Sequence, residues 1–432
     1  MIWRVGYRLL LWLLFPWALG HLWWRGRHQP GYREHIAERF GWFQVRPTRP
    51  VIWLHAVSVG ETRAAEPLVR ALAARYPGRE LLLTQMTPTG REAAQQLFGD
   101  MATIVYLPYD YPGAVARFLA HFRPCLGILM ETEIWFNLVA GCTRLGVPLL
   151  LANARMSERS ARGYQLAAPL TRAALARIAV VGAQTREDAE RLERLGARGV
   201  EVTGNLKFDV IPAPRLLALG AELRRRIGSR PVLLAASTRE GEEELVLDAF
   251  SRISIEDLLL LLVPRHPQRF DAVAVLLERR KLSYVRRSDD RPVSPGCRVL
   301  LGDSMGEMAA YYVACDLAFI GGSLLPYGGQ NLIEACAVGR PLLFGPYMHN
   351  FAEASRLALA AGAAAEVADA ATLGQRAGEL LVDQASLARM AQAALAFSRA
   401  HQGATARTLA ICERLLQERQ AADSELPKRP PT

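Results

Sequence analysis

The chain has 432 residues, which is too long for one hydrophobic core and predicts two or three domains. Hydrophobic residues make up 51% of the sequence and charged residues 22%, a composition that excludes an intrinsically disordered protein. The net charge of +10 is unevenly placed, because residues 1–50 hold eight arginines and only two glutamates. A basic excess beside an apolar segment favours an anionic membrane surface over nucleic acid as the partner.

Residues 1–28 predict a membrane anchor helix. No residue from Leu9 to Leu19 is charged, and tryptophans at positions 12, 17, 23 and 24 suit the headgroup boundary of a bilayer. The uncharged run is shorter than the roughly 20 residues that a comfortable span needs, so a short signal anchor and a helix lying in the interface both fit it. No small-x-small cleavage site follows, and we expect a retained anchor with the globular part on the cytoplasmic side.

Residues 51–63 (VIWLHAVSVGETR) change from an apolar strand to a small-residue turn and then to a helix start. In an open α/β sheet, ligands lie outside the carboxyl ends of the strands, so Glu61 on this loop is a candidate for the chemistry. Ser58 and Gly60 of the same turn are acceptor-side candidates. A glutamate in the first turn of a helix also fits a cap, where the helix dipole would lower its pKa. Position alone does not decide between catalyst and cap.

The rest of the first half, residues 29–209, predicts an α/β domain with a parallel sheet. Helical segments separate its apolar runs, as crossover connections require. The runs lie at 80–87, 102–108, 125–132, 148–154 and 177–184. Glu131 and Glu133 share one face at the end of the third run. They fit either a site or solvated loop charges, as does Lys207, one of only three lysines.

The second half repeats the pattern. Residues 210–229 hold prolines and a basic helix-like piece, which predicts an interdomain linker, and a second α/β domain follows at 230–400. Its apolar runs lie at 231–238, 257–265, 298–304, 317–323 and 341–346. The chain thus predicts two doubly wound domains that face each other across a cleft. Residues 401–432 predict a helix and, from about Arg419, a disordered tail.

Several motifs are absent. None of the 34 glycines stand as G-x-G, and G-K-[ST], D-x-D and H-E-x-x-H are missing as well. A dinucleotide fingerprint and a P-loop are therefore excluded, and no motif indicates a metal. The six cysteines form no CxxC pair and predict buried thiols of a reducing compartment. We expect phosphate to be bound by helix ends and side chains, with no cofactor.

Two candidate anion sites follow strands of the second domain. Ser237 and Thr238 precede a probable helix, whose free N–H groups attract anions, although Ser237 with Glu240 also fits a capping box. Arg265 and His266 close a very apolar strand. A basic pair at this place favours a ligand contact, since an unpaired buried arginine is costly.

Two glycine-containing loops add further candidates. Met305, Gly306 and Glu307 start a helix, and their backbone groups fit contacts with a base or ribose. Glycine pairs at 321–322 and at Gly328 and Gly329 predict a mobile loop. A short helix then runs from about Asn331 to Gly339, in which Glu334 fits either two ribose hydroxyls or a cap with Asn331.

These blocks, taken together, resemble the 3-deoxy-D-manno-octulosonic acid (Kdo) transferases from the anchor to about residue 400. The matching stretches include HAVSVGETRA, TPTGREAA, YLPYD, METEIW, ANARMS, GNLKFD, VPRHPQRF and GDSMGEM. The resemblance implies a GT-B fold, CMP-Kdo as donor and a lipid A precursor as acceptor at the cytoplasmic face of a Gram-negative inner membrane. It also implies Glu61 as general base and nucleotide contacts at Arg265, His266, Met305 to Glu307, and Asn331, Leu332, Ile333 and Glu334.

The sequence departs from the family pattern in places. Gln330 and Leu332 stand where the family usually has histidine and proline, Tyr347 replaces a histidine, and Phe136 replaces a proline. We expect a metal-independent single displacement with inversion, in which Glu61 takes the proton of the acceptor hydroxyl. A UDP-sugar-dependent transferase or epimerase and a non-catalytic membrane-bound scaffold are the alternatives.

Overall fold

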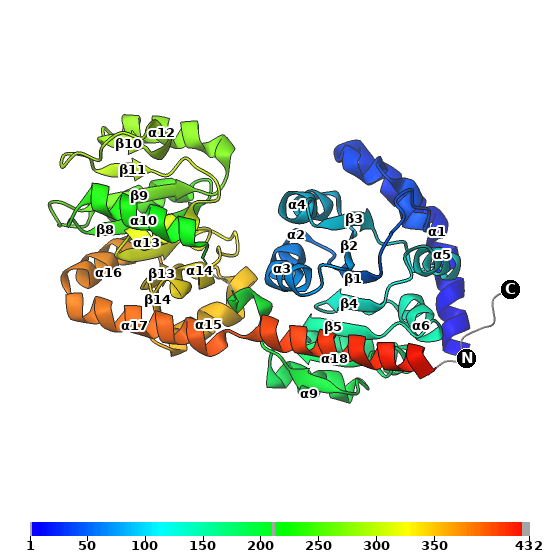
Figure 1. Cartoon of the computed structure of the whole chain (residues 1–432). Coiled ribbons are helices and arrows are strands. Elements are labelled where there is room, and N and C mark those ends of the chain that lie inside the picture. The colour runs from blue at the N-terminus through cyan, green and yellow to red at the C-terminus, as the bar shows by residue number, and fades with distance from the viewer. Residues whose placement is uncertain (1, 210–211, 426–432) are drawn as a thin grey trace. The chain divides into compact units, whose positions relative to one another are not determined.

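The computed structural model describes residues 2–209 and 212–425 and divides into two compact units (Figure 1). Unit 1 holds residues 1–209 and 402–432, and unit 2 holds residues 210–401. Each unit is built on a seven-stranded parallel sheet with helices on both faces. Both sheets are doubly wound, as the sequence predicts.

The sheet of unit 1 has the strand order β3-β2-β1-β4-β5-β6-β7. Its inner strands are buried on both faces, which is why they read as continuous apolar runs. The strands are β1 Val51–His55, β2 Glu80–Gln85, β3 Ala102–Tyr106, β4 Leu126–Met130, β5 Leu149–Ala154, β6 Val180–Ala183 and β7 Val200–Val202. Among the strands of this sheet, β7, a short strand at the edge, was the one that the sequence did not predict.

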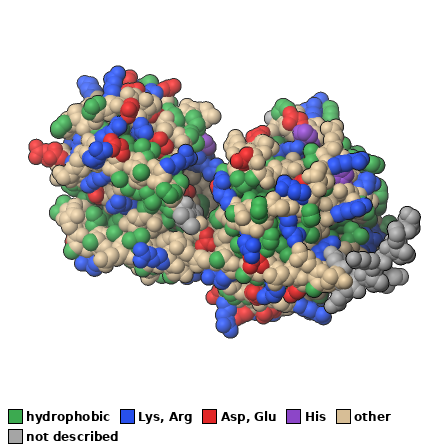
Figure 2. All heavy atoms as spheres, viewed as in Figure 1, with side chains coloured by type: hydrophobic (Ala, Val, Ile, Leu, Met, Phe, Trp, Pro, Cys, Tyr) green, Lys and Arg blue, Asp and Glu red, His purple; other side chains and the backbone are tan. Residues whose placement is uncertain are grey.

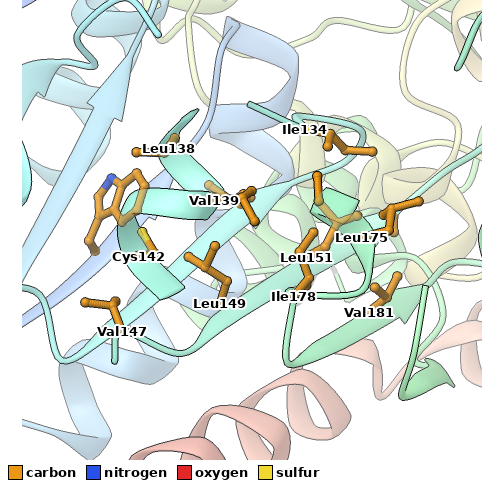
Figure 3. Packing of buried hydrophobic residues seen from close by; sticks show 14 of the residues in the cluster. Ile134, Leu138, Val139, Cys142, Val147, Leu149, Leu151, Leu175, Ile178 and Val181 are labelled. Atoms are coloured by element: carbon orange, nitrogen blue, oxygen red, sulfur yellow. The ribbon is translucent and has the colours of Figure 1, made fainter. Parts of the chain in front are cut away.

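Two apolar cores flank this sheet. Helices α5, α6, α8 and α9 cover one face, where Leu149 and Leu151 of β5 pack with Val139 and Cys142 of α6 (Figure 3). Helices α2, α3, α4 and α18 cover the other face. The helices are α1 Ile2–His28, α2 Val59–Ala64, α3 Glu66–Arg75, α4 Pro88–Phe98, α5 Pro112–Phe122, α6 Phe136–Arg144, α7 Glu158–Gln165, α8 Ala168–Leu175, α9 Arg186–Arg194 and α18 Ala404–Glu425, with short 3₁₀ turns at Pro30–Arg33, Ile36–Phe40 and Leu206–Phe208.

The sheet of unit 2 has the order β10-β11-β9-β8-β12-β13-β14. Its strands are β8 Val232–Thr238, β9 Leu259–Pro264, β10 Tyr284–Arg286, β11 Val299–Leu301, β12 Leu317–Ile320, β13 Leu342–Phe344 and β14 Ala364–Glu366. Its helices are α10 Pro214–Ile227, α11 Glu242–Ser251, α12 Phe270–Arg279, α13 Met308–Ala314, α14 Ile333–Ala337, α15 Ala352–Ala360, α16 Ala370–Val382 and α17 Gln384–His401, with 3₁₀ turns at Pro267–Arg269, Arg287–Asp289 and His349–Phe351.

Two sequence-based boundaries need correction. Residues 214–227 of the expected linker form α10, which packs on α13 within unit 2 because its face with Gly220, Leu223 and Ile227 is buried. The disordered tail was expected to begin near Arg419, but α18 continues to Glu425. The remainder of that expected tail, residues 426–432, lies outside the described residues.

Helix α1 lies against helices α5 and α6 of unit 1 (Figure 1). The Tyr7 hydroxyl donates to Asp110 at 2.9 Å, and the Tyr111 hydroxyl donates to the carbonyl of Leu11 at 2.9 Å. The opposite side of the helix is exposed, with Leu13 at 78% of its surface. Among the described residues, one helix is long and apolar enough to cross a membrane, at Val5–Arg27.

Candidate active site

Glu61 lies in the first turn of α2, at the carboxyl edge of the unit 1 sheet. Its carboxylate accepts hydrogen bonds from the backbone N–H of Val57 at 2.8 Å and from the Ser58 hydroxyl at 3.1 Å. Ser58 is the N-cap of α2, and its oxygen accepts from the Glu61 N–H at 3.5 Å. The cap and the candidate base are therefore parts of one arrangement, while Gly60 is exposed beside them.

The pKa of Glu61 is raised to about 7. Burial is the largest cause, the N–H of Val57 opposes it, and the charges of Glu131 and Glu133 raise the pKa further. The prediction that this pKa is lowered is wrong, because burial outweighs the hydrogen bonds that Val57 and Ser58 donate to the carboxylate. A carboxylate with a pKa near neutrality can accept a proton from a sugar hydroxyl and release it again.

Glu131 and Glu133 follow β4. They lie near enough to Glu61 for their negative charges to raise its pKa. Lys207 pairs with Glu131 across 3.6 Å, so the structure brings these three acceptor-side candidates together with Glu61. Burial raises the pKa of Glu133, whose carboxylate accepts from the indole N–H of Trp135 at 2.8 Å. This hydrogen bond of Trp135 was not predicted from the sequence, although Trp135 stands in the METEIW motif.

Asn153 fixes the segment that carries Lys207. Its side-chain oxygen accepts from the N–H of Leu206 at 2.9 Å, and it adopts a left-handed backbone conformation with φ of 54°. Glu131 shares this conformation with φ of 55°. Such φ values are uncommon without glycine and cluster at functional sites. The available signal for Asn153 was a polar residue inside an otherwise apolar buried strand.

In unit 2, Ser237 and Thr238 do not form the expected anion site. Helix α11 begins at Glu242 with Gly241 as N-cap, so the capping box of Ser237 with Glu240 is wrong. Thr238 is buried, and its hydroxyl donates to Glu243 at 3.2 Å. Ser237 is half-buried and has φ of 59°.

Glu242 was missed by the sequence analysis because four glutamates stand close together. Its buried carboxylate accepts from the backbone N–H groups of Gly322, Ser323 and Leu324 at 2.5 to 3.0 Å and from that of Arg239 at 3.1 Å. The glycine loop is thus held in place. Mobility, which the sequence predicted, does not explain the glycines. A Cβ on Gly321 would lie 2.6 Å from the carbonyl oxygen of Ser237, so this position has no room for a side chain.

Arg265 and His266 follow β9, and the structure adds Arg239 to this basic pair. A guanidinium nitrogen of Arg239 lies 2.5 Å from Nε2 of His266. The same guanidinium stacks over the ring of Tyr327 at 4.8 Å. Burial, then the charges of Arg239 and Arg265, lower the pKa of His266, so its imidazole is neutral near pH 7.

Both predicted loops of unit 2 lie next to helix starts, at α13 and α14. Met305 and Gly306 are exposed before α13, and Glu307 accepts from the Ser304 hydroxyl at 2.6 Å. The expected cap of Asn331 with Glu334 is wrong, because α14 begins at Ile333 with Leu332 as N-cap, and the two residues instead bond through their side chains, the Asn331 amide donating to Glu334 at 2.9 Å. Gly328 and Gly329 have φ of 92° and 75°. The side chains of Leu332 and Ile333 are buried in the core, so only their backbone groups can contact a ligand.

Of the residues that depart from the family pattern, Phe136 makes a contact that the structure shows. Phe136 starts α6, and its ring packs edge-on against Tyr7 of α1 with centroids 5.1 Å apart. Gln330 is half-buried and Tyr347 is exposed at the glycine loop. Within residues 2–209 and 212–425, no group of three His, Cys, Asp or Glu side chains could hold a metal ion.

Comparison with known proteins relates the chain to one family. The model of the 3-deoxy-D-manno-octulosonic-acid transferase (kdotransferase) family matches residues 34–210. A 3-deoxy-D-manno-octulosonic acid transferase of Bordetella pertussis is 45% identical over 425 residues, which cover 95% of this chain and 99% of that protein. The transferase of Haemophilus influenzae is 36% identical over 431 residues and covers 96% and 99%.

Solved structures support the fold class. The MurG protein of Acinetobacter baumannii has a TM-score of 0.54 at 14% identity, covering 85% of this chain and 99% of that chain. A glycosyltransferase of Rickettsia africae has a TM-score of 0.55 at 13% identity, covering 85% and 99%. At these identities the likeness shows the fold alone, which is of the GT-B type.

Proposed function

The chain belongs to the 3-deoxy-D-manno-octulosonic-acid transferase family of glycosyltransferases, and we propose that it moves Kdo from CMP-Kdo to a lipid A precursor, a tetraacyl disaccharide bisphosphate. The observation that carries this proposal is the 45% identity over nearly the whole chain to a Kdo transferase. Membership in an enzyme family removes the scaffold alternative.

We propose that Glu61 is the general base of an inverting single displacement. Its carboxylate takes the proton of the acceptor hydroxyl as that oxygen attacks the anomeric carbon of Kdo, and CMP leaves from the opposite side. The raised pKa of about 7 supports this role, because the base is then matched to the working pH. A positioned base contributes about 10²- to 10⁴-fold to the rate.

We propose that unit 2 binds the donor. Arg265, His266 and the added Arg239 offer cationic and hydrogen-bonding groups to the phosphate, and Glu334, oriented by Asn331, suits ribose hydroxyls. Met305 to Glu307 offer backbone contacts to the nucleotide. We also propose that transfer needs no metal or cofactor, with the arginines and helix ends stabilising the departing phosphate.

Membrane binding at the cytoplasmic face of the inner membrane completes the proposal. Helix α1 exposes apolar and tryptophan side chains on one side while its other side is bonded to unit 1 through Tyr7 and Leu11. A helix fixed in this way along a folded domain fits the membrane interface better than a span. Arginines lie among hydrophobic side chains over the face of unit 1 in Figure 2, which suits an anionic lipid surface.

One experiment tests the function directly. The purified protein is incubated with CMP-Kdo and the tetraacyl precursor, and the product is weighed by mass spectrometry. A mass increase of one or more Kdo units is expected, and Glu61→Gln should remove it while leaving CMP affinity nearly unchanged. Turnover of a UDP-sugar in place of CMP-Kdo would support the alternative donor instead.

A further inference from the structure

Helices α1 and α8 enclose a groove of about 340 Å³ in unit 1. Trp3 and Val5 of α1 and Leu170 and Ala173 of α8 give it an apolar lining, together with Pro169. Ligand pockets of about 300–1,000 Å³ with such linings are typical of small-molecule sites.

Two cations border this groove, and none of its described lining residues is acidic. The Nε of Arg8 donates to the side-chain oxygen of Asn137 at 3.3 Å, and a guanidinium nitrogen of Arg177 donates to the carbonyl of Ala173 at 2.6 Å. Arg177 bonds a backbone carbonyl, whereas Arg8 also lies near enough to the Asp110 carboxylate for its charge to lower the pKa of that group. The groove therefore complements a molecule with an apolar chain and an anionic group.

The groove opens where a lipid can reach it. Trp3 is 59% exposed and Val5 50%, although both line the groove. Leu166, in the short turn between α7 and α8, is 89% exposed and adds an apolar side chain to this part of the surface. A chain buried in the outer part of a bilayer can thus enter between the two helices.

Helix α8 is also tied to the acidic loop near Glu61. The Tyr164 hydroxyl donates to the carbonyl of Thr132 at 2.9 Å, between Glu131 and Glu133. The Thr171 hydroxyl of α8 donates to the carbonyl of Tyr164 at 3.0 Å. In the same segment α7 exposes Arg159 and Arg162, which are one turn apart and suit a phosphate.

We infer that the groove between α1 and α8 seats an acyl chain of the lipid acceptor. Helix α1 is then one wall of the acceptor site as well as a membrane contact. This inference rests on the proposed function, because it concerns the acceptor of the same reaction.

The test fills the groove from each wall. Val5→Trp and Ala173→Trp are compared with wild type and with Leu13→Trp, a matched change at an exposed position of α1 outside the groove. Each protein is assayed with the tetraacyl acceptor and with the same disaccharide bisphosphate without acyl chains. We expect both groove variants to raise KM for the tetraacyl acceptor about tenfold or more. KM for CMP-Kdo and rates with the acyl-free acceptor should stay as in wild type, and Val5→Trp and Leu13→Trp should bind anionic vesicles equally, since both add a tryptophan to exposed positions of α1.

The outcomes separate the inference from the function. Unchanged KM for the tetraacyl acceptor in both variants overturns the groove, and so does an equal loss with both acceptors. An equal effect of Leu13→Trp overturns it as well. If wild type transfers Kdo to neither acceptor, the proposed function itself is wrong. Val5→Trp keeps the test informative if Ala173→Trp does not fold, because Val5 lies outside the α/β core.

Discussion

Both carboxylate oxygens of Glu61 have a donor, yet the site favours its protonated form because burial and two neighbouring carboxylates act together. The balance of charge around it is set by Glu131, Glu133 and Lys207. Each of these side chains therefore influences the pH at which the base works.

This balance predicts the pH dependence of transfer. The base must be ionised, so kcat/KM should rise as the pH rises through about 7. Glu131→Gln removes a negative charge and lowers the pKa of Glu61, which shifts the rising limb to lower pH. Lys207→Met leaves Glu131 uncompensated and shifts the limb to higher pH. Rate profiles between pH 5 and 9 measure both shifts, and two shifts in the same direction would contradict the assignment.

Asn153 supports a prediction on stability. Asn153→Ala leaves the N–H of Leu206 unpaired in a buried place, at a cost of roughly 1–3 kcal/mol, and forces alanine into a left-handed conformation at about 1–2 kcal/mol more. Asn153→Gly loses only the hydrogen bond and glycine's backbone entropy. In urea unfolding, the free energy of unfolding should therefore be lowest for Asn153→Ala, higher for Asn153→Gly and highest for the wild type. Equal stabilities of the two variants would exclude strain at this position.

At the scale of elements, the glycine loop of unit 2 depends on one buried carboxylate. Glu242→Gln keeps one oxygen but replaces the other with an NH2 group, so either the N–H of Gly322 or those of Ser323 and Leu324 lose their acceptor and face a donor. We expect affinity for CMP, measured by calorimetry, to fall about tenfold or more. Glu240→Gln is the control, because that side chain is 79% exposed and stands in the same segment. If Glu240→Gln lowered the affinity for CMP as much as Glu242→Gln, the cause would be the loss of a negative charge and not the loss of the loop hydrogen bonds.

The docking of α1 predicts a second effect on stability. Asp110 accepts from Tyr7 and from the N–H groups of Asn137 and Leu138, and burial raises its pKa to about 6. Tyr7→Phe should lower the free energy of unfolding by roughly 1.5–3 kcal/mol above pH 6, where the acceptor is charged, and by less at pH 5. Hydrogen exchange in α1 should quicken in parallel. Tyr347→Phe, an exposed hydroxyl, should change neither.

Elements were predictable where one local pattern decides them. The inner strands bury both faces and read as apolar runs, whereas β7, β10 and β14 have three residues each and are partly exposed, so no such run exists. The buried acidic partner of the glycine loop was not predictable, because Glu242 gains its role from N–H groups 80 residues away.

The same distinction holds for the candidate site. Glu61, Glu131 and Glu133 could be predicted as polar residues at strand ends, and Lys207 as one of only three lysines; the structure brings them together. Arg239 could not, since its partners His266 and Tyr327 lie far away in the sequence. Asn153 was indicated only by being polar within an apolar strand, and its partner Leu206 left no local pattern. The pKa of Glu61 had the wrong predicted sign because burial is not visible in a local sequence.

At the scale of the whole molecule, the chain leaves unit 1 after Asp209 and returns at Gln402. Unit 2 is thus an insertion between unit 1 and its last helix. Asp209 marks this junction, since its carboxylate accepts from the N–H of Gly403 at 2.6 Å and from that of Thr405. The sequence predicted the helix but not its partner, because contact between residues so far apart leaves no local pattern.

This topology predicts that truncation after His401 damages unit 1 and spares unit 2. Helix α18 buries Ile411, Leu415 and Leu416 against the sheet, and each such side chain contributes roughly 1.5–3 kcal/mol. Arg419 further ties the helix to the carbonyl of Gly146 at 3.0 Å. Thermal unfolding of the truncated chain should show an early transition that acceptor analogues no longer shift, while CMP still stabilises the remaining one. Truncation after Glu425 is the matched control and should behave as wild type, because it leaves α18 complete.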